Sequence, residues 1–300
     1  KFSTEGRPAR KVCKFCTVII YFIIILLGLV CLLPLLNIVA ISFSSSAAVE
    51  GNMVGLIPVG FSTAAYEKIL EDSQFWHSFL ISVERVVLTL IINFVLIVLM
   101  AYPLSKTNAQ FRGRNIYANL MIFAMLFNGG MIPTFLLVKS YGLLNTVWAL
   151  VLPGAVPIFN VILVMNFFAA VPKELEEAAF IDGANPLQVL TKIFIPISKP
   201  VLATVSLFSI VGSWNDFYSG LIYMSKAAYY PLMTYIQSLQ INVEDLIKQG
   251  NLSAVVDSAS LGNTNLNAAK IVVAVIPLLL IYPLLQRYFV SGIVVGSVKG

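Results

Sequence analysis

Charged residues are scarce in this chain of 300 residues. Asp, Glu, Lys and Arg make up 11% of it, against roughly 25% in a typical soluble domain, while 59% of the residues are hydrophobic. A single hydrophobic core stops growing at about 250–300 residues, so an aqueous fold could not cover this much apolar surface. The composition therefore excludes a soluble globular protein and predicts one integral membrane domain over residues 1–300.

Histidine and cysteine are almost absent. His77 is the only histidine, which leaves no His-x-x-Glu-His zinc site and no Ser–His pair for nucleophilic catalysis. Cys13 and Cys16 form a C-x-x-C without the second ligand pair or the βαβ context that a metal or redox role requires. The sequence also has no G-x-x-x-x-G-K-[ST] phosphate-binding loop. We therefore predict that the chain is not an enzyme, and that a partner drives any ATP-dependent step.

Apolar stretches of bilayer-spanning length recur along the chain. About 20 apolar residues suffice to cross a hydrocarbon core roughly 30 Å thick. Six stretches qualify, at approximately Thr17–Ser42, Phe79–Tyr102, Ile116–Val138, Thr146–Ala170, Val201–Tyr223 and Ala268–Phe289. The first follows a basic run, as in a signal peptide, but its length and the later spans predict an uncleaved helix. The pattern predicts an all-α membrane protein with six transmembrane helices.

Lysine and arginine are divided unevenly between the two sides of such a bundle. If the N-terminus is cytoplasmic, thirteen of them lie on that side and six on the other. Because cytoplasmic loops carry the excess of basic residues, the count predicts that both termini are cytoplasmic. The net charge of +5 reflects this bias and gives no support to nucleic-acid binding.

One cytoplasmic loop, Val171–Pro200, is predicted to be folded. A proline and three glutamates suit the first turns of a short helix, and Gly183 supplies its C-terminal stop. Asn185 and Pro186 form an N-cap and first-turn pair for a second short helix, which should end by Pro196. The loop is therefore expected to be a helix–turn–helix on the membrane surface.

The spacing within this loop resembles the EAA loop of bacterial ABC-importer permeases. In that family E-A-A is followed by three residues, G, nine residues, I, one residue, a branched aliphatic residue and P. Every anchor is present at its distance: Glu177, Ala178, Ala179, Gly183, Ile193, Ile195 and Pro196. The resemblance implies that these residues, with Asp182, couple the chain to an ATPase subunit. The alternative is an amphipathic loop that rests on lipid.

Three weaker motifs extend the resemblance over nearly the whole chain. Ala101–Lys106, Trp214–Phe217 and Gly292–Gly300 are similar to segments of carbohydrate importers, in particular the second membrane subunit of maltose-type systems. The resemblance implies a type I ABC-importer permease in the bacterial cytoplasmic membrane. Its implied partners are a second homologous permease subunit, two ATP-binding subunits and an extracytoplasmic solute-binding protein, with ATP and Mg held by the ATPase. A homodimer, and a membrane-embedded enzyme or scaffold, remain the alternatives.

The glycine-rich C-terminus is a second candidate contact with the ATPase. Glycine gives such a tail the backbone freedom to enter a narrow gap. The resemblance implies that the tail reaches the interface of the ATP-binding subunits through Gly296, Ser297, Val298, Lys299 and Gly300. A frayed terminus is the alternative.

Polar and aromatic residues within the spans are candidates for a substrate cavity. Aromatic faces, amides and carboxylates are the groups that bind saccharides by stacking and hydrogen bonding. The predicted set is Trp214, Asn215, Asp216, Phe217 and Glu84, with interhelical hydrogen bonding as the alternative role. Arg85 is equally consistent with lining the cavity or with extending to the interface. An oligosaccharide or polysaccharide fragment is the favoured cargo, with amino-sugar, polyol and glycerophosphate-like cargo open.

Overall fold

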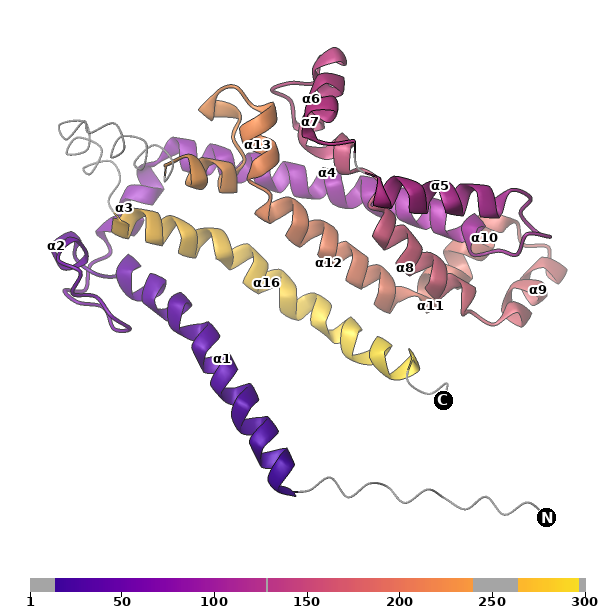
Figure 1. The fold of residues 1–300 in the computed structure, drawn as a ribbon, viewed down its shortest axis with the longest axis horizontal. Coiled ribbons are helices and arrows are strands. Elements are labelled where there is room, and N and C mark those ends of the chain that lie inside the picture. Colours follow the sequence, from indigo (N-terminus) through magenta and orange to yellow (C-terminus); the bar gives the residue numbers. More distant parts are fainter. Residues whose placement is uncertain (1–13, 128, 240–263, 297–300) are drawn as a thin grey trace. The chain divides into compact units, whose positions relative to one another are not determined.

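The computed structural model describes residues 14–127, 129–239 and 264–296, and these contain helices and no strand. They fall into two compact units, one made of Lys1–Ile69 with Ala259–Val272 and the other of Leu70–Ser258 with Val273–Gly300. Figure 1 shows the helices with their labels. The all-α character predicted from the apolar stretches is confirmed over these residues, and the single-domain organisation stays a prediction.

Among the described residues, the first unit consists of one long helix, two short helices and the start of the last helix. It holds α1 (Lys14–Ser42), α2 (Ser46–Glu50), most of α3 (Ala64–Glu71) and the start of α16 (Thr264–Gly296). The Phe43 ring stacks on Tyr66 at 4.8 Å between centroids, and Asn265 donates to the Ser44 carbonyl at 2.7 Å. The first contact holds the loop after α1 against α3, and the second holds it against the first turn of α16.

The second unit is organised around α4 (Ser73–Leu104), a helix of 32 residues and therefore about 48 Å long. The Asp72 carboxylate caps it by accepting the Phe75 backbone N–H at 3.0 Å. Its further helices include α5 (Arg114–Leu126), α6 (Met131–Ser140), α7 (Val147–Val151), α8 (Ile158–Ala169), α9 (Lys173–Ile181), α10 (Pro186–Val189), α11 (Ile195–Ile197), α12 (Lys199–Asn215) and α13 (Tyr218–Tyr223). Helices α8 and α12 pack along α4, and α9 and α10 lie at the end of α4 that contains Leu104 (Figure 1).

Three helices are long and apolar enough to cross a membrane unbroken: Thr17–Ser42, Ser73–Leu104 and Thr264–Pro283. Three bent helix pairs meet the same criteria of length and composition, and if each is one span the total among the described residues is six. The pairs are Arg114–Leu126 with Met131–Ser140, Val147–Gly154 with Ile158–Ala169, and Pro186–Ile197 with Lys199–Asn215. The predicted number agrees with this upper count.

Three of the predicted spans are bent or interrupted in the structure. Ile116–Val138 is divided between α5 and α6, with Gly130 at φ +91° just before α6. Thr146–Ala170 bends by 48° between α7 and α8, where Pro153 and Pro157 remove backbone donors.

The third interruption lies in the predicted span Val201–Tyr223. Helix α12 stops at Asn215, and α13 begins at Tyr218. Asp216 is extended, and its Oδ1 accepts the Ser219 backbone N–H at 3.1 Å. A side chain that bonds a nearby backbone group in this way competes with the helical hydrogen bond, so the helix restarts after Asp216.

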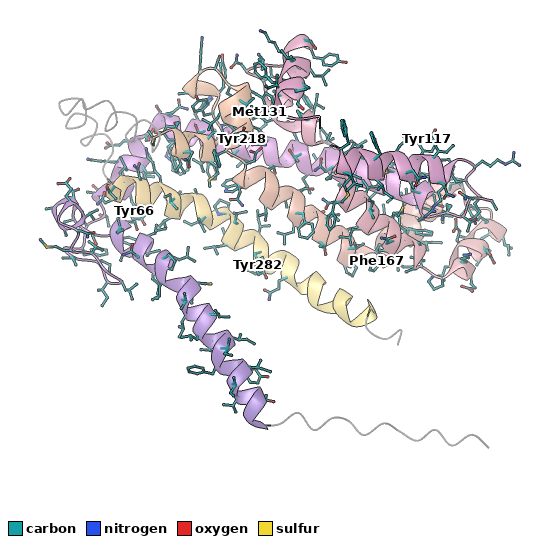
Figure 2. All side chains as sticks on the ribbon, viewed as in Figure 1. Tyr66, Tyr117, Met131, Phe167, Tyr218 and Tyr282 are labelled. Atoms are coloured by element: carbon teal, nitrogen blue, oxygen red, sulfur yellow. The ribbon has the colours of Figure 1, made fainter. Side chains whose placement is uncertain are left out.

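Helix α13 is held by a close contact at Gly220 and by a contact at its first residue. The Tyr218 hydroxyl donates to the Met131 sulfur at 3.0 Å, and Figure 2 labels the two side chains. The buried Thr234 hydroxyl donates to the Phe217 carbonyl at 2.8 Å. A Cβ built at Gly220 would lie 2.8 Å from the Thr234 Cβ, so only glycine permits this approach.

Gly220→Ala is expected to destabilise the chain by about 1–3 kcal/mol, because the new methyl group overlaps Thr234. Thermal unfolding of the detergent-solubilised protein measures the loss. Gly212→Ala is the matched control, since a Cβ at Gly212 meets nothing within 4 Å and alanine favours the helix. Equal midpoints for the two variants would contradict the close contact.

Candidate functional site

The loop between α8 and α12 is rigidly built. After α9, the Gly183 N–H donates to the Phe180 carbonyl at 3.1 Å, and the Ala184 N–H donates to the Ala179 carbonyl at 2.9 Å. This is a Schellman motif, and Gly183 supplies the left-handed residue at φ +80°. The predicted stop at Gly183 is confirmed.

A reciprocal cap opens the second helix of the loop. The Asn185 side chain accepts the Gln188 backbone N–H at 2.8 Å, and the Gln188 side chain accepts the Asn185 backbone N–H at 2.9 Å. The predicted cap at Asn185 and Pro186 is confirmed. The predicted end by Pro196 is wrong, since a π-helical segment, Leu190–Phe194, carries the chain into α11. Pro196 then lies in the first turn of α11, where its missing N–H is not needed.

One side of this loop belongs to the core of the second unit. Val189, Leu190 and Phe194 are at most 3% exposed, and they pack with the buried side chains of α4, α8 and α12. Phe194 lies edge-on to Phe168 of α8, with ring centroids 5.4 Å apart. A movement of the loop must therefore displace the helices packed on it.

The other side of the loop is exposed. Glu177 and Ala178 are exposed on α9, and Ile181, one turn later on the same face, is 86% exposed. Beside them is a hollow of about 520 Å³ lined by Ala179, Asp182, Gly183, Ala184, Gln188, Val189, Lys192 and Ile193. The structure thus brings Ala179, Asp182, Gly183 and Ile193 to one hollow. Glu177 and Ala178 are exposed on the same short helix as Ala179, and Pro196 is exposed outside the hollow.

A buried ion pair fastens α9 to the segment that follows α4. The Lys106 ammonium lies 2.7 Å from the Glu176 carboxylate, and the two side chains are 12% and 10% exposed. The ammonium also lies 4.0 Å from the centre of the Tyr102 ring and 4.2 Å from that of Phe194. Burial lowers the pKa of Lys106, and the bond to Glu176 opposes that shift.

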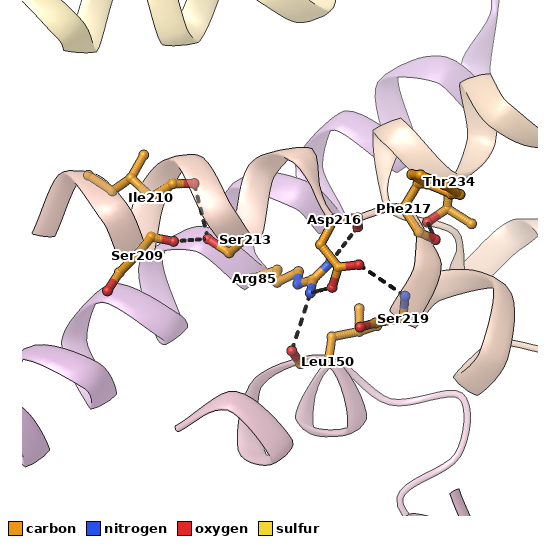
Figure 3. A network of polar contacts seen from close by, with 9 residues as sticks. All are labelled: Arg85, Leu150, Ser209, Ile210, Ser213, Asp216, Phe217, Ser219 and Thr234. Atoms are coloured by element: carbon orange, nitrogen blue, oxygen red, sulfur yellow. Dashed lines mark hydrogen bonds and ion pairs between the residues drawn. The ribbon is translucent and has the colours of Figure 1, made fainter. Parts of the chain in front are cut away.

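A polar cavity of about 250 Å³ lies farther along α4, between that helix, α8 and α12. Its wall includes the Arg85–Asp216 ion pair drawn in Figure 3. Arg85 donates to the Asp216 backbone carbonyl at 2.9 Å as well as to its carboxylate, and is 3% exposed. The arginine thereby connects α4 to the break between α12 and α13.

Further polar side chains line the same cavity. They are Thr89 and Asn93 on α4, Asn160 on α8, Ser209 and Ser213 on α12, and Ser219 on α13. Arg85 Nε and Thr89 Oγ1 are buried without a hydrogen-bond partner among the described residues. Buried polar atoms are nearly always hydrogen-bonded, so water or a ligand is expected to bind these two groups.

The structure separates the five residues predicted to line a cavity. Asp216 lies in the wall, whereas Glu84 is exposed on α4 and does not line the cavity. Trp214 is buried, and its indole N–H donates to the Ala274 carbonyl at 3.1 Å, so it holds α12 against α16. Asn215 and Phe217 are exposed outside the cavity. Trp214 therefore has the alternative role, which is to form a hydrogen bond between helices.

A family comparison agrees with this arrangement of membrane helices, folded loop and cavity. Residues 78–295 match the family described as binding-protein-dependent transport system inner membrane component. The chain belongs to this family. The folded loop, the cavity and all of α4 except its first five residues lie within the matched residues.

Individual relatives align with this chain over nearly its whole length. It is 40% identical to protein LplC of Bacillus subtilis over 91% of both chains. It is also 40% identical to the polygalacturonan/rhamnogalacturonan transport system permease protein YtcP of the same organism, over 94% of this chain and 97% of that one. A chain in the crystal structure of a bacterial ABC transporter involved in the import of the acidic polysaccharide alginate has 32% identity and a TM-score of 0.82, covering 95% of this chain and all of that one. The fold is that of a type I ABC-importer permease.

The residues predicted from the sequence to line the cavity did not include most of the polar residues that form its wall. The buried polar residues of α4 recur every three or four positions, at Ser78, Ser82, Arg85, Thr89 and Asn93. That spacing places them on one helical face, and it was visible in the sequence. The predicted tail contact involves Gly296, which is the last residue of α16, and residues 297–300, which lie outside the described residues. It therefore stays a prediction.

Proposed function

We propose that this chain is one of two membrane subunits of an ATP-driven carbohydrate importer, and that an ATPase subunit docks on α9 and α10. The observation that carries the proposal is the exposed patch around Glu177, Ala178 and Gly183, on a loop whose opposite side enters the core. An amphipathic loop lying on lipid would bury its apolar face in the bilayer. In this chain Leu190 and Phe194 are buried in protein, and Ile181 remains exposed.

The implied assembly contains a second homologous permease subunit, two ATP-binding subunits and an extracytoplasmic solute-binding protein. ATP and Mg bind to the ATPase, and both termini of this chain are cytoplasmic. The thirteen-to-six division of basic residues supports that orientation. The tail, residues Gly296, Ser297, Val298, Lys299 and Gly300, is proposed to reach the ATPase interface.

The proposed cargo is an oligosaccharide derived from a polysaccharide. Names of relatives that refer to polygalacturonan, rhamnogalacturonan and alginate support this class. The cavity beside Arg85 offers amides, hydroxyls and one ion pair, which match the donors and acceptors of sugar hydroxyl groups. We propose that Thr89 Oγ1 and Arg85 Nε, buried without partners among the described residues, contact the passing sugar or its water.

Purification of the tagged chain from the cells that encode it tests this proposal. After extraction in mild detergent we expect a protein with a phosphate-binding loop to co-purify. In proteoliposomes containing the complex and its solute-binding protein, labelled oligosaccharide should accumulate with ATP and Mg, and not with a non-hydrolysable ATP analogue. Recovery of no ATPase, or accumulation without ATP, would contradict the proposal.

A further inference from the structure

We propose that Lys106 is a positioning residue that transmits movement of α9 to α4, through its ion pair with Glu176 and its contacts with two aromatic rings. This inference rests on the proposed docking of an ATPase on α9 and α10. It concerns the connection between that docking surface and the helix that lines the cavity. Tyr102, Lys106, Glu176 and Phe194 are together called the clamp.

The clamp joins the end of α4 to two parts of the loop between α8 and α12. Tyr102 lies in the last turn of α4, Lys106 just after that helix, Glu176 in α9, and Phe194 in the π-helical segment. The Tyr102 and Phe194 rings meet edge-on at 5.1 Å, and both lie beside the Lys106 ammonium. The Tyr102 hydroxyl is 3.4 Å from the Glu176 carboxylate. The Lys106 ammonium thus lies against both α9 and the π-helical segment, and Tyr102 of α4 contacts the same two elements.

The burial of this pair makes the connection stiff. An ion pair exposed to solvent contributes little to stability, because water and salt compete for both charges. With side chains 12% and 10% exposed, Lys106 and Glu176 cannot separate without leaving a charge buried and unpaired. Loop and helix are therefore expected to move as one body at this point.

The same helix carries the cavity. Arg85, Thr89 and Asn93 lie on α4, 17, 13 and 9 residues before Tyr102, so the clamp is about 26 Å from Arg85 along the helix axis. Packed helices move as rigid bodies and pass small shifts over such distances. A displacement of α9 by the ATPase would thus reach the cavity wall through α4.

Lys106→Met tests this connection, because methionine retains much of the side-chain volume and loses the charge. Uptake and ATP hydrolysis are measured together in proteoliposomes that contain the full complex. We expect sugar taken up per ATP hydrolysed to fall on the order of tenfold, within the usual range for coupling between sites, while the ATPase remains bound. Arg112→Met, which removes an exposed charge from the same segment, should leave that ratio unchanged.

Two further variants separate transmission from folding. Lys106→Arg keeps the charge and the ring contacts, so it should restore most of the ratio. The double variant that combines Lys106→Glu with Glu176→Lys should take up more sugar per ATP hydrolysed than either single variant. This comparison holds even where one of the single variants folds poorly. An unchanged ratio in Lys106→Met, or uptake that falls only in proportion to lost ATPase binding, would overturn the inference. Failure of the unaltered chain to bind any ATPase would instead refute the proposed function.

Discussion

Asp216→Ala is expected to destabilise the chain by about 3–5 kcal/mol, because it leaves the Arg85 guanidinium buried without its carboxylate. Arg85 is 3% exposed, and the described residues provide no partner for its Nε. The change also removes the side chain that accepts the Ser219 backbone N–H at the start of α13. Thermal unfolding in detergent and the yield of monodisperse protein should both fall.

Two comparisons identify the cause of that loss. Glu84→Ala removes a neighbouring but exposed carboxylate, and a change of this kind usually alters stability by less than about 0.5 kcal/mol. Adding Arg85→Met to Asp216→Ala removes the unpaired charge, so part of the stability should return. If Asp216→Ala unfolds at the same temperature as Glu84→Ala, the buried pair does not stabilise the fold.

Gly183→Asp is expected to reduce ATP-driven uptake by about tenfold or more. A side chain at Gly183 must adopt φ +80°, which strains the Schellman turn, and its carboxylate would enter the hollow beside Asp182. A loss of only 1.4 kcal/mol in docking free energy weakens ATPase binding tenfold. Uptake in proteoliposomes and co-purification of the ATPase measure the effect, and the amount of protein inserted in the membrane should stay normal.

Gly142→Asp is the matched control for the turn. Gly142 also has a positive φ, at +67°, and like Gly183 has nothing within 4 Å of a Cβ. It lies between α6 and α7, outside the proposed docking surface. Both variants therefore carry similar backbone strain, and only Gly183→Asp should lose uptake. Equal uptake by the two variants would remove the loop from the coupling step.

Local chemistry could be predicted well from the sequence. The stop at Gly183 and the cap at Asn185 depend on neighbours within five residues, and both were confirmed. The apolar stretches were also recognisable, because their length alone satisfies the bilayer. The breaks at Gly130 and Asp216 were missed, since hydrophobicity averaged over a span does not report a single backbone position, whereas the prolines at 153 and 157 were recognisable as sites where a helix bends.

The composition and the apolar stretches of the sequence were sufficient to predict a membrane protein of helices with a folded loop at Val171–Pro200, and the resemblance of that loop to the EAA motif indicated the family. The tertiary structure decided which polar groups meet. Arg85 and Asp216 are 131 residues apart, and Lys106 and Glu176 are 70 apart. Whether such a charge is paired, exposed or buried depends on the packing of helices α4, α8 and α12, and side-chain periodicity within one helix carries no information about its neighbour. For that reason Glu84 was predicted to line the cavity, whereas the wall is formed by the adjacent Arg85.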